Sequence, residues 1–387
     1  MIVRLTYSEA NGRLDLWGGT TGTYGGLDRF NRVIDQRWQN NVTTTPVDID
    51  RQEYGYDRDS NRQWTANPLT TARDSYYTYD TLSRLTKAQW GVLNGTKTGI
   101  TTPVEEMDFT LDPTSNWSAY VRTQLSSTLV NQTRTHNEAN EITGYGGTTP
   151  WSTPSYDAAG NYTGAPDDAL TLTYDAWNRP AYYAHESGRR VYYSYDGVNR
   201  RIVSDEQLPD GETVTDYYYT DRWQDIEERV GGSTSANRQY VWGVRYVDDL
   251  VCRDDATYGR QYVMQDANYS TTSICDTSGS VEERYSPGPY GDWYVFGPSW
   301  GVHPIPTAYA WYIGHQGLLT DATTGYIYNR NRMLDPLTGR FLQRDPLGYV
   351  DGMNLYEYER SELNGQLDPD GNSILGAIVC DGNGNVV

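Results

Sequence analysis

The sequence has few of the residues that build a conventional aliphatic core, a metal site or a membrane span. It contains only 4 Phe, 5 Met, 4 His and 3 Cys among its 387 residues. The cysteines, Cys252, Cys275 and Cys380, are odd in number and lack metal-ligand spacing, so buried free thiols are favoured over a disulfide between two of them. No apolar run approaches the roughly 18 residues that a membrane helix needs. We therefore predict no metal, no cofactor and no membrane span.

Lysine is also almost absent, because Lys87 and Lys97 are the only two lysines among 31 basic residues. The formal net charge is −20. A nucleic-acid partner would require a basic patch, and the sequence contains none, which excludes nucleic-acid binding as a function. Arginine in place of lysine suits planar pairing with carboxylates and stacking on aromatic rings.

Tyrosine, tryptophan and glycine are abundant instead. The chain has 35 Tyr, 12 Trp, 38 Gly and 17 Pro, while hydrophobic residues as a whole make up 37%. Tyrosine favours strands because its ring can be buried while its hydroxyl stays hydrogen-bonded, and glycine and proline supply turns. The composition predicts a folded, β-rich protein rather than a disordered chain.

A short unit recurs along the first half of the chain. It starts with an apolar residue or Tyr followed by Asp, continues with two or three small residues, and ends with Asn, Ser or Gly before a polar residue, usually Arg. The Asp can cap a tight turn and the Asn or Gly tolerates a left-handed conformation, so each unit predicts one β-hairpin. Lone hairpins are marginal in water, and successive units must pair into one continuous sheet. Seven copies begin at Leu27, Tyr56, Tyr79, Leu111, Tyr156, Tyr174 and Tyr195, and a decayed copy begins at His136.

The most specific stretch covers residues 325–371 and contains three Asp-Pro turns. They start at Asp335, Asp345 and Asp368, and the last two continue as Asp-Pro-x-Gly, which is type I turn chemistry. Two longer runs accompany these turns, Arg332-Met-Leu-Asp335-Pro-Leu-Thr-Gly-Arg340-Phe and Asn354-Leu-Tyr-Glu-Tyr358.

These motifs closely resemble the core that ends the shell of RHS/YD-repeat proteins. That family includes the bacterial RHS polymorphic toxins, the shell-forming subunit of insecticidal toxin complexes and, as distant relatives, the teneurins. Two departures stand out: Met333 and Leu334 replace the usual pair of tyrosines, and Asn372 stands where the family usually has Leu.

The resemblance implies an all-β fold in which hairpins form a spiralling sheet, a hollow shell or part of one, with the core segment plugging one end. We expect a repeat array at 1–216, a strand-rich junction at 217–324 with a Gly-, Pro- and Trp-rich loop at 286–306, the RHS-associated core at 325–371 and a short variable tail at 372–387. The first residues lack the charged and apolar regions of a signal peptide and read as the middle of a repeat, which predicts a piece of a longer protein.

In shell proteins of this family the core is an aspartic-type protease that cuts its own chain once, in cis. The family's Arg and two Asp correspond to Arg332, Asp345 and Asp368, and the implied scissile bond joins Asn372 to Ser373. Two carboxylates held close together cannot both ionise readily, so one can act as acid and the other as base, and a nearby Arg can hold one of them ionised or stabilise an oxyanion. The residues alone leave open a purely structural role, in which both Asp cap turns and Arg332 makes an ion pair.

Two functions follow from this interpretation. The first is a shell module that encapsulates its own C-terminal segment and releases it by autoproteolysis after Asn372. The second is a non-enzymatic, extracellular structural or adhesive repeat protein that self-assembles or binds a glycan or cell-surface partner. Open sheet edges would need covering by another repeat chain or a second copy. By family resemblance, we expect the protein to be secreted or displayed on a bacterial cell surface.

Overall fold

The computed structural model describes residues 3–6, 26–30, 32–40, 47–164, 170–301, 307–350, 352–362 and 367–372, with the backbone alone for residues 3–6. This part of the chain contains 28 β-strands in three sheets, together with three short 3-10 turns and no α-helix. Paired strands run antiparallel. None of the described segments forms a helix that is long and apolar enough to cross a membrane. The all-β prediction is confirmed.

The first sheet has ten strands in sequence order. They are β1 (Val3–Thr6), β2 (Asp35–Asn40), β3 (Val47–Tyr56), β4 (Arg62–Ala66), β5 (Asp74–Tyr79), β6 (Leu85–Leu93), β7 (Ile100–Leu111), β8 (Trp117–Gln124), β9 (Ser127–His136) and β10 (Ile142–Gly147). A 3-10 turn, η1 (Thr71–Arg73), precedes β5.

The second sheet has fourteen strands, again in sequence order. They are β11 (Ser155–Tyr156), β12 (Tyr162–Gly164), β13 (Leu170–Tyr174), β14 (Pro180–His185), β15 (Arg190–Tyr195), β16 (Arg201–Leu208), β17 (Gly211–Tyr219), β18 (Asp225–Val230), β19 (Arg238–Trp242), β20 (Leu250–Asp255), β21 (Gly259–Gln265), β22 (Thr271–Cys275), β23 (Val281–Pro287) and β24 (Trp293–Phe296). Cys252 and Cys275 in this sheet are buried free thiols, whereas Cys380 lies outside the described residues.

The third sheet is small and belongs to the C-terminal part of the chain. Its strands are β25 (Leu319–Thr320), β26 (Ile327–Asn329), β27 (Arg332–Asp335) and β28 (Arg340–Phe341), flanked by the 3-10 turns η2 (His315–Gly317) and η3 (Glu359–Ser361).

The turn of each repeat is closed by its aspartate, as the sequence predicts. In the turn at residues 80–84, the Asp80 carboxylate accepts hydrogen bonds from the backbone N–H groups of Leu82 (2.9 Å) and Arg84 (3.0 Å) and from Arg84 Nε (2.8 Å). Ser83 is left-handed, with φ +63°. The residue at the same fourth position is left-handed in other copies as well: Ser60, Ser115, Asn140, Gly160, Asn178 and Asn199.

Arginine and tyrosine connect neighbouring hairpins, which explains why they surround each Asp. Arg84 Nη1 donates to the carbonyl oxygen of Asp112 in the next turn (2.8 Å). Tyr79 Oη donates to the carbonyl oxygen of Arg62 on the preceding hairpin (2.8 Å). These links add to the backbone ladder and exist only within an array, where each hairpin has neighbours. The Arg link recurs at Arg32, Arg179 and Arg200, and the Tyr link at Tyr56, Tyr195 and Tyr219.

Further turns of the same geometry lie beyond the predicted copies, among them those at residues 220–224, 266–270 and 276–280. Their fourth residues, Trp223, Tyr269 and Gly279, are left-handed with φ of +65°, +61° and +79°. In the first of these turns Thr220 replaces the aspartate, which hides the unit from a search for the pattern. The second sheet runs without a break through residues 216 and 217, and the division of the chain at that point stays a prediction.

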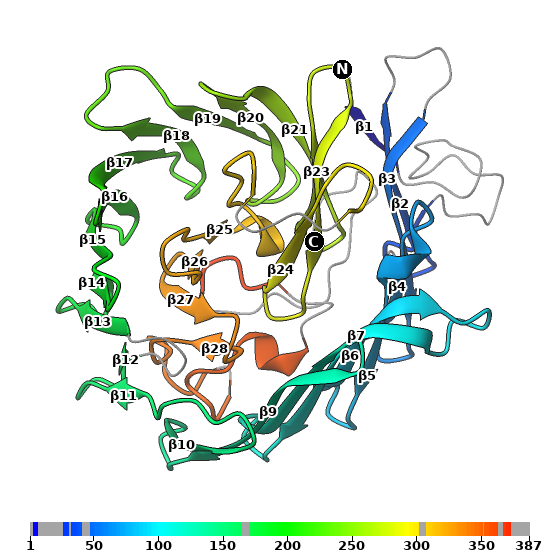
Figure 1. The fold of residues 1–387 in the computed structure, drawn as a ribbon, viewed down its shortest axis with the longest axis horizontal. Helices are drawn as coiled ribbons and strands as arrows, with labels where there is room; N and C mark the ends of the chain where they lie inside the picture. Colours follow the sequence, from blue (N-terminus) through cyan, green and yellow to red (C-terminus); the bar gives the residue numbers. More distant parts are fainter. Residues whose placement is uncertain are drawn as a thin grey trace.

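The two large sheets curve into a ring, and the ring closes where β21–β23 meet β2–β4 (Figure 1). Gln36 Nε2 donates to the carbonyl oxygen of Gln265 (2.9 Å), and the N–H of Ala267 donates to Tyr54 Oη (3.1 Å). The closure therefore uses side chains rather than strand pairing. Because β1 and β24 are terminal in the sheet order, the covering of open edges by another chain stays a prediction.

The C-terminal strands β25–β28 lie inside this ring (Figure 1). The two large sheets form the wall of the ring. On one side Phe341 packs in a buried cluster with Leu85 of the first sheet, and on the other Met333 packs in a cluster with Val191 of the second sheet. Burying side chains of this size contributes about 1.5–3 kcal/mol each. The inner faces of two opposite walls thus fix the position of the core segment.

Candidate active site

The site is built on the hairpin formed by β26 and β27. Cross-strand pairing sets Ile327 opposite Leu334 and Asn329 opposite Arg332, and directly opposed residues point to the same face of a hairpin. The Arg332 guanidinium is buried and stacks 3.6 Å from the centroid of the Phe341 ring. This stacking fixes the direction in which the positive charge points.

Asp345 meets this guanidinium from a tight turn. Its Oδ2 lies 3.0 Å from Arg332 Nη2. Its Oδ1 accepts the backbone N–H of Leu347 (2.8 Å), and its carbonyl oxygen accepts that of Gly348 (3.0 Å). The Asp-Pro-x-Gly turn therefore orients the carboxylate, as the sequence predicts.

Asp368 approaches the same nitrogen and is almost fully buried, at 1% exposure. Its Oδ2 lies 3.7 Å from Arg332 Nη2, and its Oδ1 has no hydrogen-bond partner among the described residues. Burial raises the pKa of Asp368 to about 7, although the charge of Arg332 acts in the opposite direction. The structure thus brings Arg332, Asp345 and Asp368 together, while their catalytic role stays a prediction.

The chain segment after Asp368 lies against the hairpin. Arg332 Nε donates to the carbonyl oxygen of Gly371. Gly371 has φ +71°, and a side chain there would collide with the carbonyl oxygen of Asn329. Asn372 follows directly and is half-buried. Ser373, the other half of the predicted scissile bond, lies outside the described residues.

Glu359 is a third buried acid near the site, and no sequence pattern singles it out. It is 1% exposed, and its Oε1 accepts a hydrogen bond from Gln316 Nε2 (2.5 Å). Burial raises the pKa of Glu359 well above its usual value, and the nearby Asp368 carboxyl raises it further. Glu359 (φ +47°) and Gln316 (φ +51°) are both left-handed, a strained conformation for non-glycine residues that is common at functional sites.

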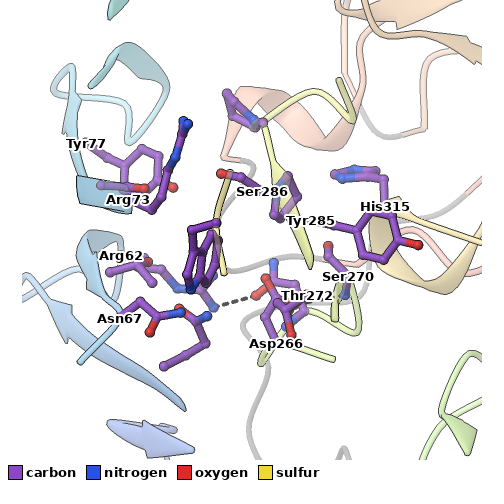
Figure 2. A pocket seen from close by; sticks show the side chains of 18 residues that line it. Arg62, Asn67, Arg73, Tyr77, Asp266, Ser270, Thr272, Tyr285, Ser286 and His315 are labelled. Carbon is purple, nitrogen blue, oxygen red and sulfur yellow. Dashed lines mark hydrogen bonds between the residues drawn. The ribbon is translucent and has the colours of Figure 1, made fainter. Parts of the chain in front are cut away.

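A separate polar cavity of about 60 Å³ lies at the seam between the two large sheets (Figure 2). Arg62 from β4 faces the turn that carries Asp266 and Asn268, and His315 from η2 lies on the opposite side. Arg62 Nη2 donates to Asn268 Oδ1. Burial lowers the pKa of His315 to about 4, and its Nε2 pairs with Tyr358 Oη (2.9 Å). This cavity is a feature of the wall closure, and none of the three predicted site residues lines it.

Known proteins with similar sequences include a toxin subunit and a nuclease. No family model matches the chain. It is 41% identical to toxin subunit YenC2 of Yersinia entomophaga over 197 residues, which cover 46% of this chain and 19% of that protein. It is 26% identical over 224 residues to the tRNA3(Ser)-specific nuclease WapA of Bacillus spizizenii, covering 56% of this chain and 9% of the nuclease.

Solved structures of toxin complexes have a similar fold. The crystal structure of TcdB2-TccC3 aligns over 88% of this chain with a TM-score of 0.68 at 19% identity, and the Photorhabdus luminescens Tc holotoxin pore aligns over 92% with a TM-score of 0.68 at 18% identity. The chain spans 18% of each of these two structures and no more than about a fifth of the curated relatives.

The fold is thus a β-shell wall of hairpin repeats wrapped around a core segment. In sequence and in fold the chain resembles RHS/YD-repeat proteins, in which such a shell ends in a C-terminal core.

Proposed function

We propose that this chain is a shell module that encloses its own C-terminal segment and cuts that segment free once, in cis, by hydrolysis of the bond between Asn372 and Ser373. One observation carries the proposal. A single guanidinium nitrogen of Arg332 faces two carboxyl groups, one of which, Asp368, is buried with a pKa of about 7.

The two carboxyl groups have complementary roles in this reaction. Asp345, ion-paired with Arg332 at 3.0 Å, acts as the base and takes a proton from a water molecule whose oxygen bonds to the carbonyl carbon of Asn372. Asp368 acts as the acid and gives its proton to the nitrogen of Ser373 as the C–N bond breaks. The products are a carboxyl group on Asn372 and an amino group on Ser373, so water is the only co-reactant.

The packing of the core segment supports enclosure. Wall clusters hold β26–β28 from two sides, so the segment that leaves the site at residue 372 starts inside the ring. YenC2 is named a toxin subunit and WapA a nuclease, which is consistent with an enclosed segment of toxic activity in a protein that is secreted or displayed on a bacterial surface.

The alternative function, a non-enzymatic structural or adhesive module, has one observation in its favour. Large apolar side chains are exposed at the third position of four repeat turns: Phe30 is 55%, Leu82 is 65%, Trp177 is 71% and Val198 is 57% exposed. Apolar side chains that are exposed side by side form contact surfaces, so an array of such turns would offer a binding face to a glycan, a surface protein or a second copy.

The mass of the purified chain separates the two functions. We expect the wild-type chain to have lost residues 373–387, and the Asp345→Asn variant to keep its full-length mass because the base is gone. Asp335→Asn is the matched control. Asp335 is also a buried aspartate that precedes a proline in the core. Its carboxylate accepts hydrogen bonds from the backbone N–H of Leu337 and the hydroxyl of Thr338, in its own turn, and not from Arg332.

Full-length masses for both the wild type and Asp345→Asn would refute the protease and leave the structural module. Cleavage in the wild type that disappears equally in Asp335→Asn would point to a general requirement for a folded core instead of a role for Asp345.

A further inference from the structure

The hairpin turn that carries Arg332 holds successive carbonyl groups of the C-terminal segment. Each of three consecutive residues of the turn supplies one side-chain donor, and each donor meets the next carbonyl along the segment. In order, Arg330 Nη1 binds the carbonyl oxygen of Pro369, Asn331 Nδ2 that of Asp370 (2.9 Å) and Arg332 Nε that of Gly371. The segment is therefore bound in a defined register, one residue at a time.

The next carbonyl belongs to Asn372, and it is the group that the proposed hydrolysis attacks. One polar side chain at this hairpin, that of Asn329, is unused. Asn329 is fully buried, at 0% exposure, and neither its Nδ2 nor its Oδ1 has a hydrogen-bond partner among the described residues. A buried amide without partners is strongly unfavourable, and such groups are rare in folded proteins.

The position of Asn329 matches that carbonyl. Asn329 pairs with Arg332 across the hairpin, so both side chains point to the face on which the carboxyl groups lie. The segment also passes directly over Asn329, because a Cβ atom on Gly371 would collide with the Asn329 carbonyl oxygen. An unpaired donor, a buried setting and close contact with the segment thus occur at one residue.

We propose that residues 329–332 form a subsite for the peptide backbone, in which Asn329 Nδ2 donates a hydrogen bond to the carbonyl oxygen of Asn372. This inference rests on the proposed cleavage for its catalytic consequence. When water adds to the carbonyl carbon, negative charge develops on that oxygen, and a fixed amide donor in a buried site stabilises it. In this proposal Asn329 contacts the reacting carbonyl group during hydrolysis and acts together with Asp345 and Asp368.

The activity test compares Asn329→Ala with Asn161→Ala. Asn161 is also buried (2% exposed), but its amide is bonded to Asp157 Oδ2 and Asn178 Oδ1, both at 2.9 Å, in the wall. Each chain is recovered uncut in denaturant from insoluble material and refolded by dilution, and its intact mass is followed with time. Loss of one oxyanion donor typically slows a reaction about 100- to 1000-fold, so we expect that decrease for Asn329→Ala and a nearly unchanged rate for Asn161→Ala.

The order of the two variants should reverse when stability is measured instead of the cleavage rate. A merely structural role of Asn329 would not produce this reversal. In the uncut Asp345→Asn background, Asn161→Ala should lower the thermal midpoint because it breaks two hydrogen bonds. Asn329→Ala should leave the midpoint unchanged or lower it far less. Asn329→Asp, which keeps the shape but replaces the donor with an acceptor, should be as slow as Asn329→Ala. A cleavage rate for Asn329→Ala within threefold of the wild type would overturn the catalytic assignment.

The hydrogen bond itself can be measured without cleavage. The dipeptide Asn-Ser occurs once in the sequence, at residues 372 and 373. Labelling Asn with ¹³C at the carbonyl and Ser with ¹⁵N therefore gives a single carbonyl–nitrogen correlation in an NMR spectrum of the uncut Asp345→Asn chain. We expect Asn329→Ala to shift this carbonyl resonance and Asn161→Ala to leave it in place.

The cleavage assay and the NMR measurement together distinguish failure of the proposed protease from failure of the proposed subsite. A shifted resonance in a protein whose wild type is never cut would retain the subsite and reject the protease. An unmoved resonance would reject the subsite, whether or not the chain cleaves.

Discussion

Replacing Gly371 with alanine should detach the C-terminal segment from its hairpin while the shell stays folded. Gly371 is left-handed, with φ +71°, and a Cβ there would collide with the backbone carbonyl oxygen of Asn329. The chain contains a matched control. Gly348 ends the other Asp-Pro-x-Gly turn with φ +73°, and a Cβ at that position would meet nothing within 4 Å.

The two substitutions differ by the collision. Forcing an L-residue into the left-handed region costs roughly 1–2 kcal/mol at either site. At Gly371 the backbone must also move, which breaks the hydrogen bonds to the carbonyl oxygens of Asp370 and Gly371. A neutral hydrogen bond contributes about 1 kcal/mol and one to a charged group about 1.5–3 kcal/mol. The docked state should therefore lose roughly 2–4 kcal/mol more in Gly371→Ala, which corresponds to a decrease of about 30- to 1000-fold in its population.

Hydrogen–deuterium exchange of the peptide that contains residues 367–372 measures this difference directly. In the Asp345→Asn background, Gly371→Ala should increase exchange there by that factor, and Gly348→Ala should not, while urea unfolding of the wall changes little in either. In the chain with Asp345 intact, cleavage should slow in parallel for Gly371→Ala. Equal exchange in the two variants would show that the segment does not depend on close contact with Asn329, and the register argument would fail.

Two further outcomes follow from charge. The proposed acid Asp368 has a pKa of about 7, so it is protonated below that pH and ionised above it. The rate of cleavage, measured by intact mass, should therefore decrease as the pH rises through 7. A rate that keeps rising to pH 9 would contradict the role of Asp368 as the acid. In the wall, Arg84→Ala removes the pair with Asp80 and the hydrogen bond to the next turn, and should lower the free energy of unfolding in urea by about 1–2 kcal/mol. The control Arg58→Ala, at an exposed turn position, should stay within about 0.5 kcal/mol of the wild type. Equal effects of the two changes would argue that the hydrogen bond of Arg84 to the next turn does not stabilise the sheet.

The repeat turns could be predicted because every determinant is local. The Asp, the left-handed residue and the following Arg lie within five positions, so their spacing is visible in the sequence. The turn at residues 220–224 escaped prediction because Thr220 accepts the same backbone N–H groups through a hydroxyl. The prediction of Arg332, Asp345 and Asp368 as site residues came from family spacing, since nothing local would distinguish a catalytic aspartate from a turn cap.

Contacts between distant segments could not be predicted from the sequence. The wall closure pairs Tyr54 with Ala267, residues that share no pattern and lie far apart in the chain. Glu359 and Gln316 meet only because two strained turns are packed against each other. The unpaired amide of Asn329 is likewise a property of the packed interior, because whether a polar group has a partner is decided by every segment that surrounds it.

The same dependence on distant segments sets the order in which the site can form. Arg330, which binds the carbonyl oxygen of Pro369, is itself ion-paired with Asp248 of the wall, 82 residues earlier in the chain. Arg332 stacks on Phe341, which is buried in a cluster with wall residues of the first sheet. The hairpin therefore lacks its fixed orientation until both walls have folded around it. For the proposed cleavage, this order predicts that cutting follows enclosure.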